Sequence, residues 1–198
     1  MANVVTFDEE SHSYNLLTGE PVPGVTTILS SLNNFGAIPM DVLHNAALRG
    51  TQVHRLCELY DLGETTECDE RLIPYVEAWV RFRNDTGFEP DAIEERVYHP
   101  LHHYAGTLDR VGVLYGRRAI VDLKTSYELS PVTALQTAAY LEAWNHQRPR
   151  AGRAVRRYAV QLKKDGTYFV QEYSDSDDFE TFLAALALHQ WKSRCERK

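Results

Sequence analysis

The chain has 198 residues, of which 43% are hydrophobic and 25% are charged. This composition is close to that of ordinary globular proteins, so it excludes intrinsic disorder and collagen-like arrays, and the length suits one domain. No apolar run approaches the roughly 20 residues that a membrane-spanning helix needs, and the first residues do not resemble a signal peptide. We therefore expect a soluble intracellular protein without a membrane partner.

Cysteine count and net charge narrow the class of protein further. Three widely spaced cysteines (Cys57, Cys68 and Cys195) form no CxxC pair and are too few for a four-cysteine iron–sulfur site. The net charge of −7 argues against nonspecific coating of nucleic acid. It does not exclude a nuclease, because carboxylates that hold divalent ions keep such sites acidic until the ion binds.

The first half of the chain is predicted to be mainly helical after an N-terminal β-hairpin. Loose alternation and a Thr-Gly turn within residues 4–22 predict the hairpin. A short helix follows Pro23-Gly24, with Thr26 or Thr27 placed to cap it. Apolar residues at helical spacing predict helices over 39–62 and 71–83. Gly50 interrupts the first of these patterns, which leaves open whether that stretch is one helix or two.

The second half of the chain is predicted to alternate between strands and helices. Strands are expected over 92–99, 104–114, 117–124, 154–162 and 167–173, and helices over 131–146 and 177–195. The Lys-Asp-Gly sequence at 164–166 is a good hairpin turn. This order predicts a mixed α/β fold with a central mixed β-sheet flanked by helices. Residues 1–198 are expected to form a single domain, in which the N-terminal hairpin and helices extend the core.

The predicted strand AIVDLK, residues 119–124, combines the residues of a buried strand with two charged ones. A two-residue turn at Tyr115-Gly116 would place Asp109 opposite Asp122, with their Cβ atoms roughly 5 Å apart. Lys124 falls on the same face, because side chains alternate along a strand. Two adjacent carboxylates repel each other, and a divalent cation between them removes the repulsion.

This arrangement indicates metal-dependent chemistry. Carboxylate oxygens, a backbone carbonyl and water suit Mg²⁺ or Mn²⁺. Protonated Lys124 cannot bind a metal ion, but it could hold a substrate anion, help to deprotonate water or stabilise a developing negative charge. Together these groups indicate hydrolysis of a phosphodiester. The alternative is that Asp122 and Lys124, two residues apart on the strand, form a simple salt bridge at the rim of the sheet. The register that brings Asp109 close rests on the Tyr-Gly turn, which is a weaker hairpin signal than Asn-Gly.

The stretch GTLDRVGVLYGRRAIVDLKTS, followed by LQTAAY, resembles the RecB-like branch of the PD-(D/E)XK nuclease superfamily. The pattern of that branch is a G-x-x-D strand, a D-x-K strand ending in Thr-Ser or Thr-Gly, and Q-x-x-x-Y on the next helix. Upstream, RGTQVH resembles the helical motif of the branch that ends in histidine, and GVTTIL resembles an element near the start of many phage members. Order and spacing are most similar to phage-type exonucleases and the mitochondrial genome maintenance exonuclease, which is specific for single-stranded DNA.

The resemblance implies a metal site and a catalytic lysine within a restriction-endonuclease-like core. Asp109, Asp122 and the backbone carbonyl of Leu123 would hold the ion, and both aspartates would count as catalytic. His54 would complete the coordination or contact the scissile phosphate, although a lone histidine on a helix can also be an ordinary packed residue. Lys124 would be the catalytic lysine.

The resemblance also implies contacts to substrate. Gln136 and Tyr140 lie four residues apart and so face the same way on a helix, where they would position the strand end or the bases. Thr125 and Ser126 close the D-x-K motif and would contact substrate as well.

Other candidates carry weaker signals. Glu94 matches a glutamate often present on the first strand of the branch, but Glu95 is adjacent and the choice between them stays open. We expect His99, His102 and His103 to be exposed, because they have no partner cluster. The chain has one basic block, which suits either solvated loops or a path for a phosphate backbone: Arg148, Arg150, Arg153, Arg156, Arg157, Lys163 and Lys164.

We therefore expect a Mg²⁺- or Mn²⁺-dependent DNA exonuclease of phage or bacterial type that prefers single-stranded ends. It would act in the cytoplasm of a bacterium or of a phage-infected host cell, alone or with a recombination or replication partner protein. One alternative is a double-strand exonuclease that works with a recombination annealing protein. Another is a nucleic-acid-binding subunit without catalytic activity.

Overall fold

The computed structural model describes residues 5–8, 11, 13–33 and 39–196. Its described strands form two sheets. The larger sheet has the order β4-β5-β6-β7-β8, in which β6 and β7 are parallel and all other neighbours are antiparallel. Its strands are β4 (Glu89–His99), β5 (Tyr104–Leu114), β6 (Arg117–Lys124), β7 (Arg156–Leu162) and β8 (Tyr168–Tyr173). The smaller sheet is antiparallel and consists of β1 (Val5–Asp8), β2 (Ser13–Leu16) and β3 (Pro21–Val22).

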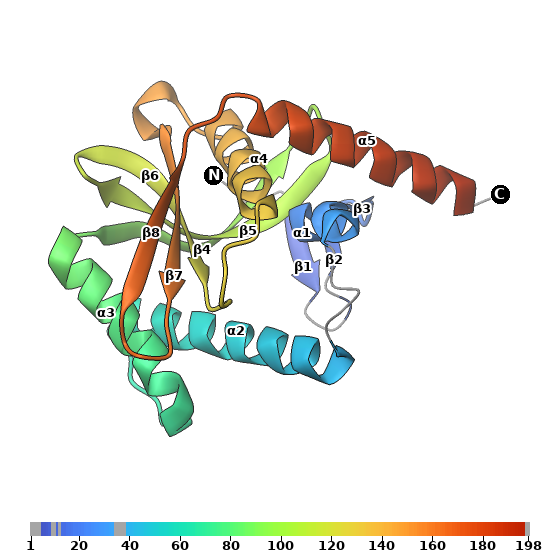
Figure 1. Cartoon of the computed structure of the whole chain (residues 1–198). Coiled ribbons are helices and arrows are strands. Elements are labelled where there is room, and N and C mark those ends of the chain that lie inside the picture. Colours follow the sequence, from blue (N-terminus) through green and yellow to red (C-terminus); the bar gives the residue numbers. More distant parts are fainter. Residues whose placement is uncertain (1–4, 9–10, 12, 34–38, 197–198) are drawn as a thin grey trace.

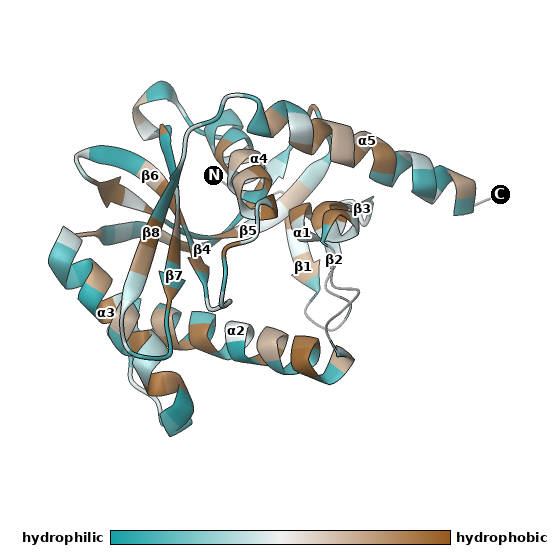
Figure 2. Cartoon of the chain, viewed as in Figure 1, coloured by the Kyte–Doolittle hydropathy of each residue, from teal (hydrophilic) through white to brown (hydrophobic). Residues whose placement is uncertain are grey.

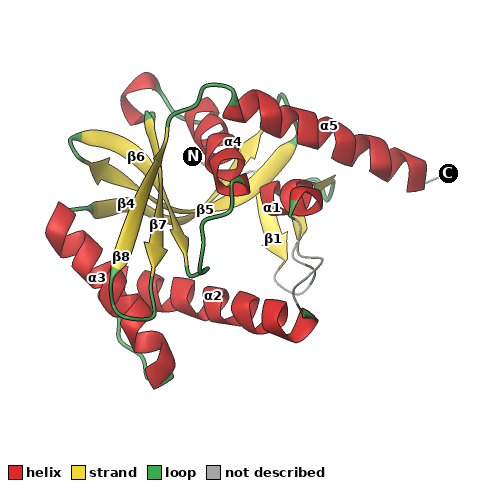
Figure 3. Cartoon of the chain, in the orientation of Figure 1, coloured by secondary structure: helices red, strands yellow, loops and turns green. Residues whose placement is uncertain are grey.

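Helices cover both faces of the larger sheet (Figure 1 and Figure 3). One face carries α1 (Val25–Leu29), α4 (Val132–His146) and α5 (Asp178–Glu196). The opposite face carries α2 (Met40–Asp61) and α3 (Ile73–Thr86). Each face has its own buried apolar cluster, so the sheet is the middle layer of three.

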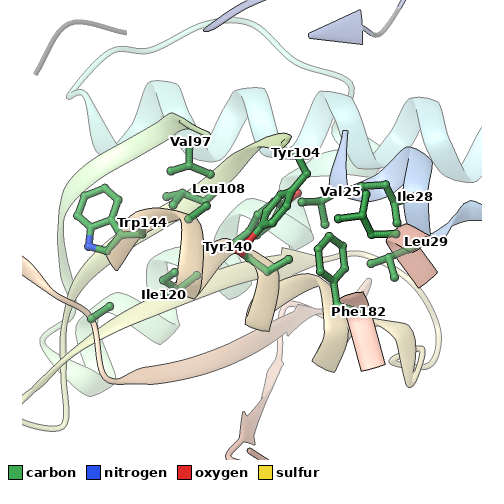
Figure 4. Packing of buried hydrophobic residues seen from close by; sticks show 14 of the residues in the cluster. Val25, Ile28, Leu29, Val97, Tyr104, Leu108, Ile120, Tyr140, Trp144 and Phe182 are labelled. Atoms are coloured by element: carbon green, nitrogen blue, oxygen red, sulfur yellow. Dashed lines mark hydrogen bonds between the residues drawn. The ribbon is translucent and has the colours of Figure 1, made fainter. Parts of the chain in front are cut away.

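Burial on both faces explains why the strands in the middle of the sheet are so apolar. On β6, Ile120 packs in the cluster with α4, whereas Val121 and Leu123 pack in the cluster with α2 and α3. In the hydropathy colours, β7 carries a brown stretch within the sheet (Figure 2). Tyr104 and Phe182 form the centre of the first cluster, with their ring centroids 4.8 Å apart (Figure 4). Asp122, between Val121 and Leu123, therefore lies in the interior of the protein.

The two central strands part from each other halfway along their length. Pairing of β5 with β6 runs from Leu114–Arg117 to Arg110–Val121 and stops there, while β6 stays paired with β7 as far as Lys124. Beyond this point β5 has a different neighbour. The Ala105 N–H donates to the Pro23 carbonyl over 3.0 Å, and Gly24 forms a parallel bridge with Ala105. The N-terminal segment thus lies where β6 would have continued, and an opening is left between β5 and β6.

Most of the predicted elements are confirmed, including the Tyr115-Gly116 hairpin turn. Both turn residues have positive φ, 51° and 73°, as a two-residue hairpin of the favoured twist requires. Residues 40–61 form one helix, so Gly50 does not split it. The expected register is confirmed as far as Arg110–Val121, where the strand pairing ends, and the facing positions of Asp109 and Asp122 one step further stay a prediction.

Three further expectations need correction or lie partly outside the described residues. The predicted Thr26 or Thr27 cap is wrong, since α1 begins after Gly24 without a side-chain cap. His99 is buried rather than exposed, because its ring packs between those of His102 and His146, with centroids 4.7 and 4.8 Å away. The N-terminal hairpin predicted over residues 4–22 lies partly outside the described residues, which omit 4, 9, 10 and 12, but its Thr18-Gly19 turn is confirmed between β2 and β3, where the Gly19 N–H donates to the Leu16 carbonyl over 2.8 Å.

No helix in the described ranges combines the length and the apolar character that crossing a bilayer would require.

Close packing explains why the G-x-x-D strand has a glycine at position 106. A Cβ atom on Gly106 would lie 2.5 Å from Cε1 of Tyr140, a distance that real Cβ atoms do not adopt. Tyr140 is buried on α4 with 3% of its surface exposed. The tyrosine ring of one motif therefore lies directly on the backbone of the other.

We expect Gly106→Ala to destabilise the protein by about 1–3 kcal/mol, because the Tyr140 ring or the strand must move. Urea denaturation measures the change. Gly50→Ala is the matched control: its Cβ would meet Thr125 Oγ1 at 3.7 Å, an ordinary contact, and alanine is the better helix former by about 1 kcal/mol. A Gly106→Ala protein as stable as the parent would show that the close approach is not real.

Candidate active site

Where the β5–β6 pairing ends, a side-chain carboxylate accepts the hydrogen bond of a β6 backbone N–H. The Leu123 N–H donates a 2.6 Å hydrogen bond to Oδ2 of Asp109. Asp109 is 7% exposed, and Asp122, which follows the last paired residue of β6, is 1% exposed. The opening between the strands is therefore lined by buried acidic groups, which helices from both faces of the sheet approach.

Helix α2 brings a histidine to this opening. His54 Nε2 lies 3.0 Å from the Leu123 carbonyl oxygen, and its Nδ1 lies 3.5 Å from Oδ1 of Asp109. Strand β4 adds Glu94 from the other side of β5. One ligand atom from each of His54, Glu94 and Asp109 lies within 4.8 Å of the other two. The structure thus brings a histidine, two carboxylates and a backbone carbonyl into one small volume.

A second set of side chains extends from β6 to α4. Lys124 Nζ lies 2.7 Å from Oδ2 of Asp122 and donates a 3.0 Å hydrogen bond to Oε1 of Gln136. The Gln136 amide in turn donates to the Tyr140 hydroxyl over 3.3 Å. Four of the predicted residues, Asp122, Lys124, Gln136 and Tyr140, therefore form one connected row.

The charges of this region shift one another's protonation. Burial opposes the charged form of His54, but the carboxylates of Asp109 and Glu94 outweigh it and raise the pKa to about 9. Burial, together with the charge of Asp109, raises the pKa of Glu94 and of Asp122 above the usual range for carboxyl groups. Burial also opposes the ionised form of Asp109, yet His54, Lys124 and the Leu123 N–H lower its pKa. Glu94 and Asp122 therefore keep their protons to a higher pH than ordinary carboxyl groups do.

These groups fit a divalent metal ion. Neither oxygen of the buried Asp122 carboxylate accepts a hydrogen bond with good geometry from the described residues, although the Lys124 ammonium lies close to one of them. Unsatisfied carboxylate oxygens next to two further acids, an imidazole and a carbonyl supply the hard donors that Mg²⁺ and Mn²⁺ use. A bound dication would also replace the protons that the raised pKa values retain.

Some of the predicted site residues are not part of this cluster. Asp122 does not belong to the group of three potential ligands, which contains Glu94 instead. Ser126 is exposed, and its hydroxyl donates to the Glu128 carbonyl within the loop. Thr125 is half-buried beside Gly50 of α2. Contacts of Thr125 and Ser126 with substrate stay a prediction.

Glu94 is the residue that the sequence left undecided. Its backbone is left-handed, with φ 47°, although both neighbours pair normally with β5. Glu95 instead pairs with Arg148, 2.9 Å away. The match to a first-strand glutamate was the available signal, but a left-handed residue in the middle of a strand cannot be read from residue types.

The basic block is largely engaged within the protein. Arg157 is buried and pairs with Asp178 over 2.9 Å, and Arg156 pairs with Glu172 over 2.8 Å. Arg148 lies over the Trp144 ring, 4.0 Å from its centroid, besides pairing with Glu95. These contacts favour a structural role for three of the five arginines.

Comparisons with known proteins place this geometry in a family. The sequence profile described as the PD-(D/E)XK nuclease superfamily matches residues 68–196, a range that contains Glu94, Asp109, Asp122 and Lys124 but not His54. A comparison with curated proteins finds no significant match.

Solved structures show a related fold. A "putative exonuclease" from Eubacterium rectale aligns with a TM-score of 0.52 and 15% identity over 73% of this chain and 65% of its own length. The alkaline exonuclease LHK-Exo from Laribacter hongkongensis gives a TM-score of 0.42 with 16% identity, over 74% of this chain and 81% of its own. LHK-Exo in complex with dAMP gives 0.45 with 14% identity, over 89% and 90%.

At these identities the likeness to the Eubacterium protein concerns the fold, a mixed sheet between layers of helices. The sequence profile covers well over half of the chain, including both strands of the acidic opening. The chain is a member of the PD-(D/E)XK nuclease superfamily.

Proposed function

We propose that this protein is a metal-dependent DNA exonuclease that hydrolyses phosphodiester bonds from strand ends and prefers single-stranded DNA. The observation that carries the proposal is the cluster of buried Asp109 with half-buried His54 and Glu94 beside the Leu123 carbonyl, with the Lys124 ammonium close to Asp122. A cluster of this kind, in a member of a nuclease superfamily, suits a charged phosphodiester substrate.

The residues that would hold Mg²⁺ or Mn²⁺ are Asp109, Glu94, His54 and the carbonyl of Leu123, with Asp122 at the edge of the site. What a divalent ion supplies in such a site is neutralisation of phosphate charge and a bound water of lowered pKa. The protein's part is to keep these donors fixed in a buried place, where their charges act over a short range with little screening.

Lys124 is proposed to stabilise the charge that develops on the phosphate. Burial disfavours its ammonium form, but Asp122 and Asp109 outweigh this and raise its pKa, so the group is cationic at neutral pH. Its hydrogen bond to Gln136 directs the ammonium toward α4. A fixed cation that is already oriented costs little reorganisation when charge develops in the transition state.

The shape of the site supports action at a strand end. A pocket of about 210 Å³ lies directly beside Lys124, between α1 and α4, and is lined by Thr26, Leu29, Asn33, Lys124, Ser130, Val132, Thr133 and Gln136. Its walls include hydroxyl and amide groups that can bind a terminal sugar or phosphate. A pocket of this size suits one end of a chain rather than a continuous duplex.

The preference for single strands rests on the motif order, which is similar to that of the mitochondrial genome maintenance exonuclease. Action in the cytoplasm and work with a recombination or replication protein are further parts of the proposal. Digestion of single- and double-stranded DNA separates the two strand preferences.

We expect Lys124→Met to reduce DNA digestion by about a hundredfold or more, because a charged donor to the transition state is lost while side-chain volume is kept. The assay uses end-labelled single- and double-stranded DNA with Mg²⁺, Mn²⁺ or EDTA. Lys192→Met, which removes an exposed lysine of α5, is the matched control and should digest like the parent.

Shortening that EDTA abolishes and Lys124→Met loses would support the proposed function and reveal strand preference and polarity. Faster digestion of duplex ends would favour the double-strand alternative. If no DNA is shortened in either metal, the proposal fails, and DNA binding without turnover would favour a non-catalytic subunit.

The metal site gives a second prediction. We expect Glu94→Gln to weaken Mn²⁺ binding about tenfold or more, since it removes a charged oxygen from the cluster, and Asp109→Asn to weaken it at least as much. Isothermal titration calorimetry measures the affinity. Glu95→Gln is the control, because the adjacent glutamate pairs with Arg148 instead. Equal affinity in Glu94→Gln and the parent would exclude Glu94 as a ligand.

A further inference from the structure

A buried arginine contacts the cluster of His54, Glu94 and Asp109. Arg110 follows Asp109 on β5 and has no solvent exposure. Its Nε donates to Oδ2 of Asp61 over 2.6 Å, and its Nη1 donates to Oε1 of Glu94 over 2.9 Å and to the Asp109 carbonyl over 2.7 Å. One guanidinium thus connects a helix end, a candidate metal ligand and the backbone of another.

Asp61 gives this contact a rigid base. It is the last residue of α2, its side chain is fully buried, and it also accepts hydrogen bonds from Trp79 Nε1 at 2.9 Å and Arg83 Nη1 at 2.8 Å on α3. His54 lies seven residues earlier on the same helix, which is two turns and therefore the same face. Asp61 and His54 therefore lie on one face of α2, where Asp61 contacts Arg110 and His54 lies 3.5 Å from Asp109.

Glu94 needs such a support. Its left-handed backbone is unfavourable for a residue with a Cβ atom and persists where the surrounding structure determines it. Ile93 and Glu95 on either side are paired with Arg110 and Leu108, so the strand does not relax around it. The Arg110 guanidinium donates a hydrogen bond to the Glu94 carboxylate and so holds its side chain.

We propose that Arg110 and Asp61 are positioning residues, which hold Glu94 and His54 in the geometry that binds the metal ion. This inference rests on the proposed function and adds the groups that act through the ligands rather than on the substrate. A buried ion pair could also serve stability alone, and the experiment must separate the two roles.

The test compares two buried arginines of the same sheet. Arg110→Met removes the contacts to Asp61 and Glu94, and Arg157→Met removes a buried arginine of β7 that pairs with Asp178 and contacts none of the three clustered ligands. Mn²⁺ affinity is measured by calorimetry, and kcat and KM are measured at increasing Mn²⁺, both at a temperature where circular dichroism shows folded protein.

We expect Arg110→Met to weaken Mn²⁺ binding about 10- to 100-fold, as loss of groups that orient metal ligands does, with kcat partly restored by high Mn²⁺ and KM for DNA unchanged. Arg157→Met should lose stability but keep the parent's Mn²⁺ affinity. If Arg110→Met does not fold, Arg110→Lys and Asp61→Asn take its place: the first keeps the charge without the forked hydrogen bonds, and the second keeps the shape without the charge.

Parent-like Mn²⁺ affinity in the folded Arg110 and Asp61 variants would overturn the inference. So would an equal loss of affinity in Arg157→Met, because the effect would then follow from destabilisation. The proposed function fails separately, if the parent protein binds Mn²⁺ but digests no DNA; the affinities still decide the positioning role in that case.

Discussion

The hydrogen bond from the Leu123 N–H to the Asp109 carboxylate joins two strands at the point where they separate. Because β6 leaves β5 there but stays paired with β7, backbone groups in the middle of the sheet lose their strand partner and need another. The Asp109 carboxylate is the partner of the Leu123 N–H on β6, and the Pro23 carbonyl is the partner of the Ala105 N–H on β5. The opening that results is lined by the backbone and side chains of an intact sheet, so its geometry is more rigid than that of a site built on loops.

Charge balance in this opening explains the rest of the site. Asp109, Asp122 and Glu94 are drawn from three strand positions into one buried region, where ionised carboxylates are costly unless they are paired. Positive charge lies next to each of them: Lys124 is close to Asp122, His54 to Asp109 and Arg110 to Glu94. The two cations differ in exposure: Arg110 is fully buried and donates three hydrogen bonds, whereas the Lys124 side chain is 24% exposed, as the proposed contact with a substrate phosphate requires. Arg110 is therefore suited to hold the site residues in place, and Lys124 is suited to contact substrate.

The sequence predicted those features that depend on local chemistry. The Tyr-Gly turn and the apolar alternation on either side of it are properties of neighbouring residues, so the β5–β6 hairpin and its first pairs follow from them. Gly50 shows where local propensity loses: its cost within α2 is modest, and packing of Val53 and Cys57 against the sheet keeps the helix continuous. The separation of the strands after Arg110, the left-handed Glu94 and the burial of His99 depend on contacts distant in sequence. No pattern of residue types encodes the contact between Asp61 and Arg110, which are 49 positions apart.

The central claim is that these donors form one divalent-metal site, and an anomalous difference map from crystals soaked in Mn²⁺ tests it most directly. We expect a strong peak within coordination distance of Asp109 and the Leu123 carbonyl, with Glu94 or His54 completing the protein ligands. Soaked crystals that show no peak there at saturating Mn²⁺, or a peak only at another place on the molecule, would contradict the account.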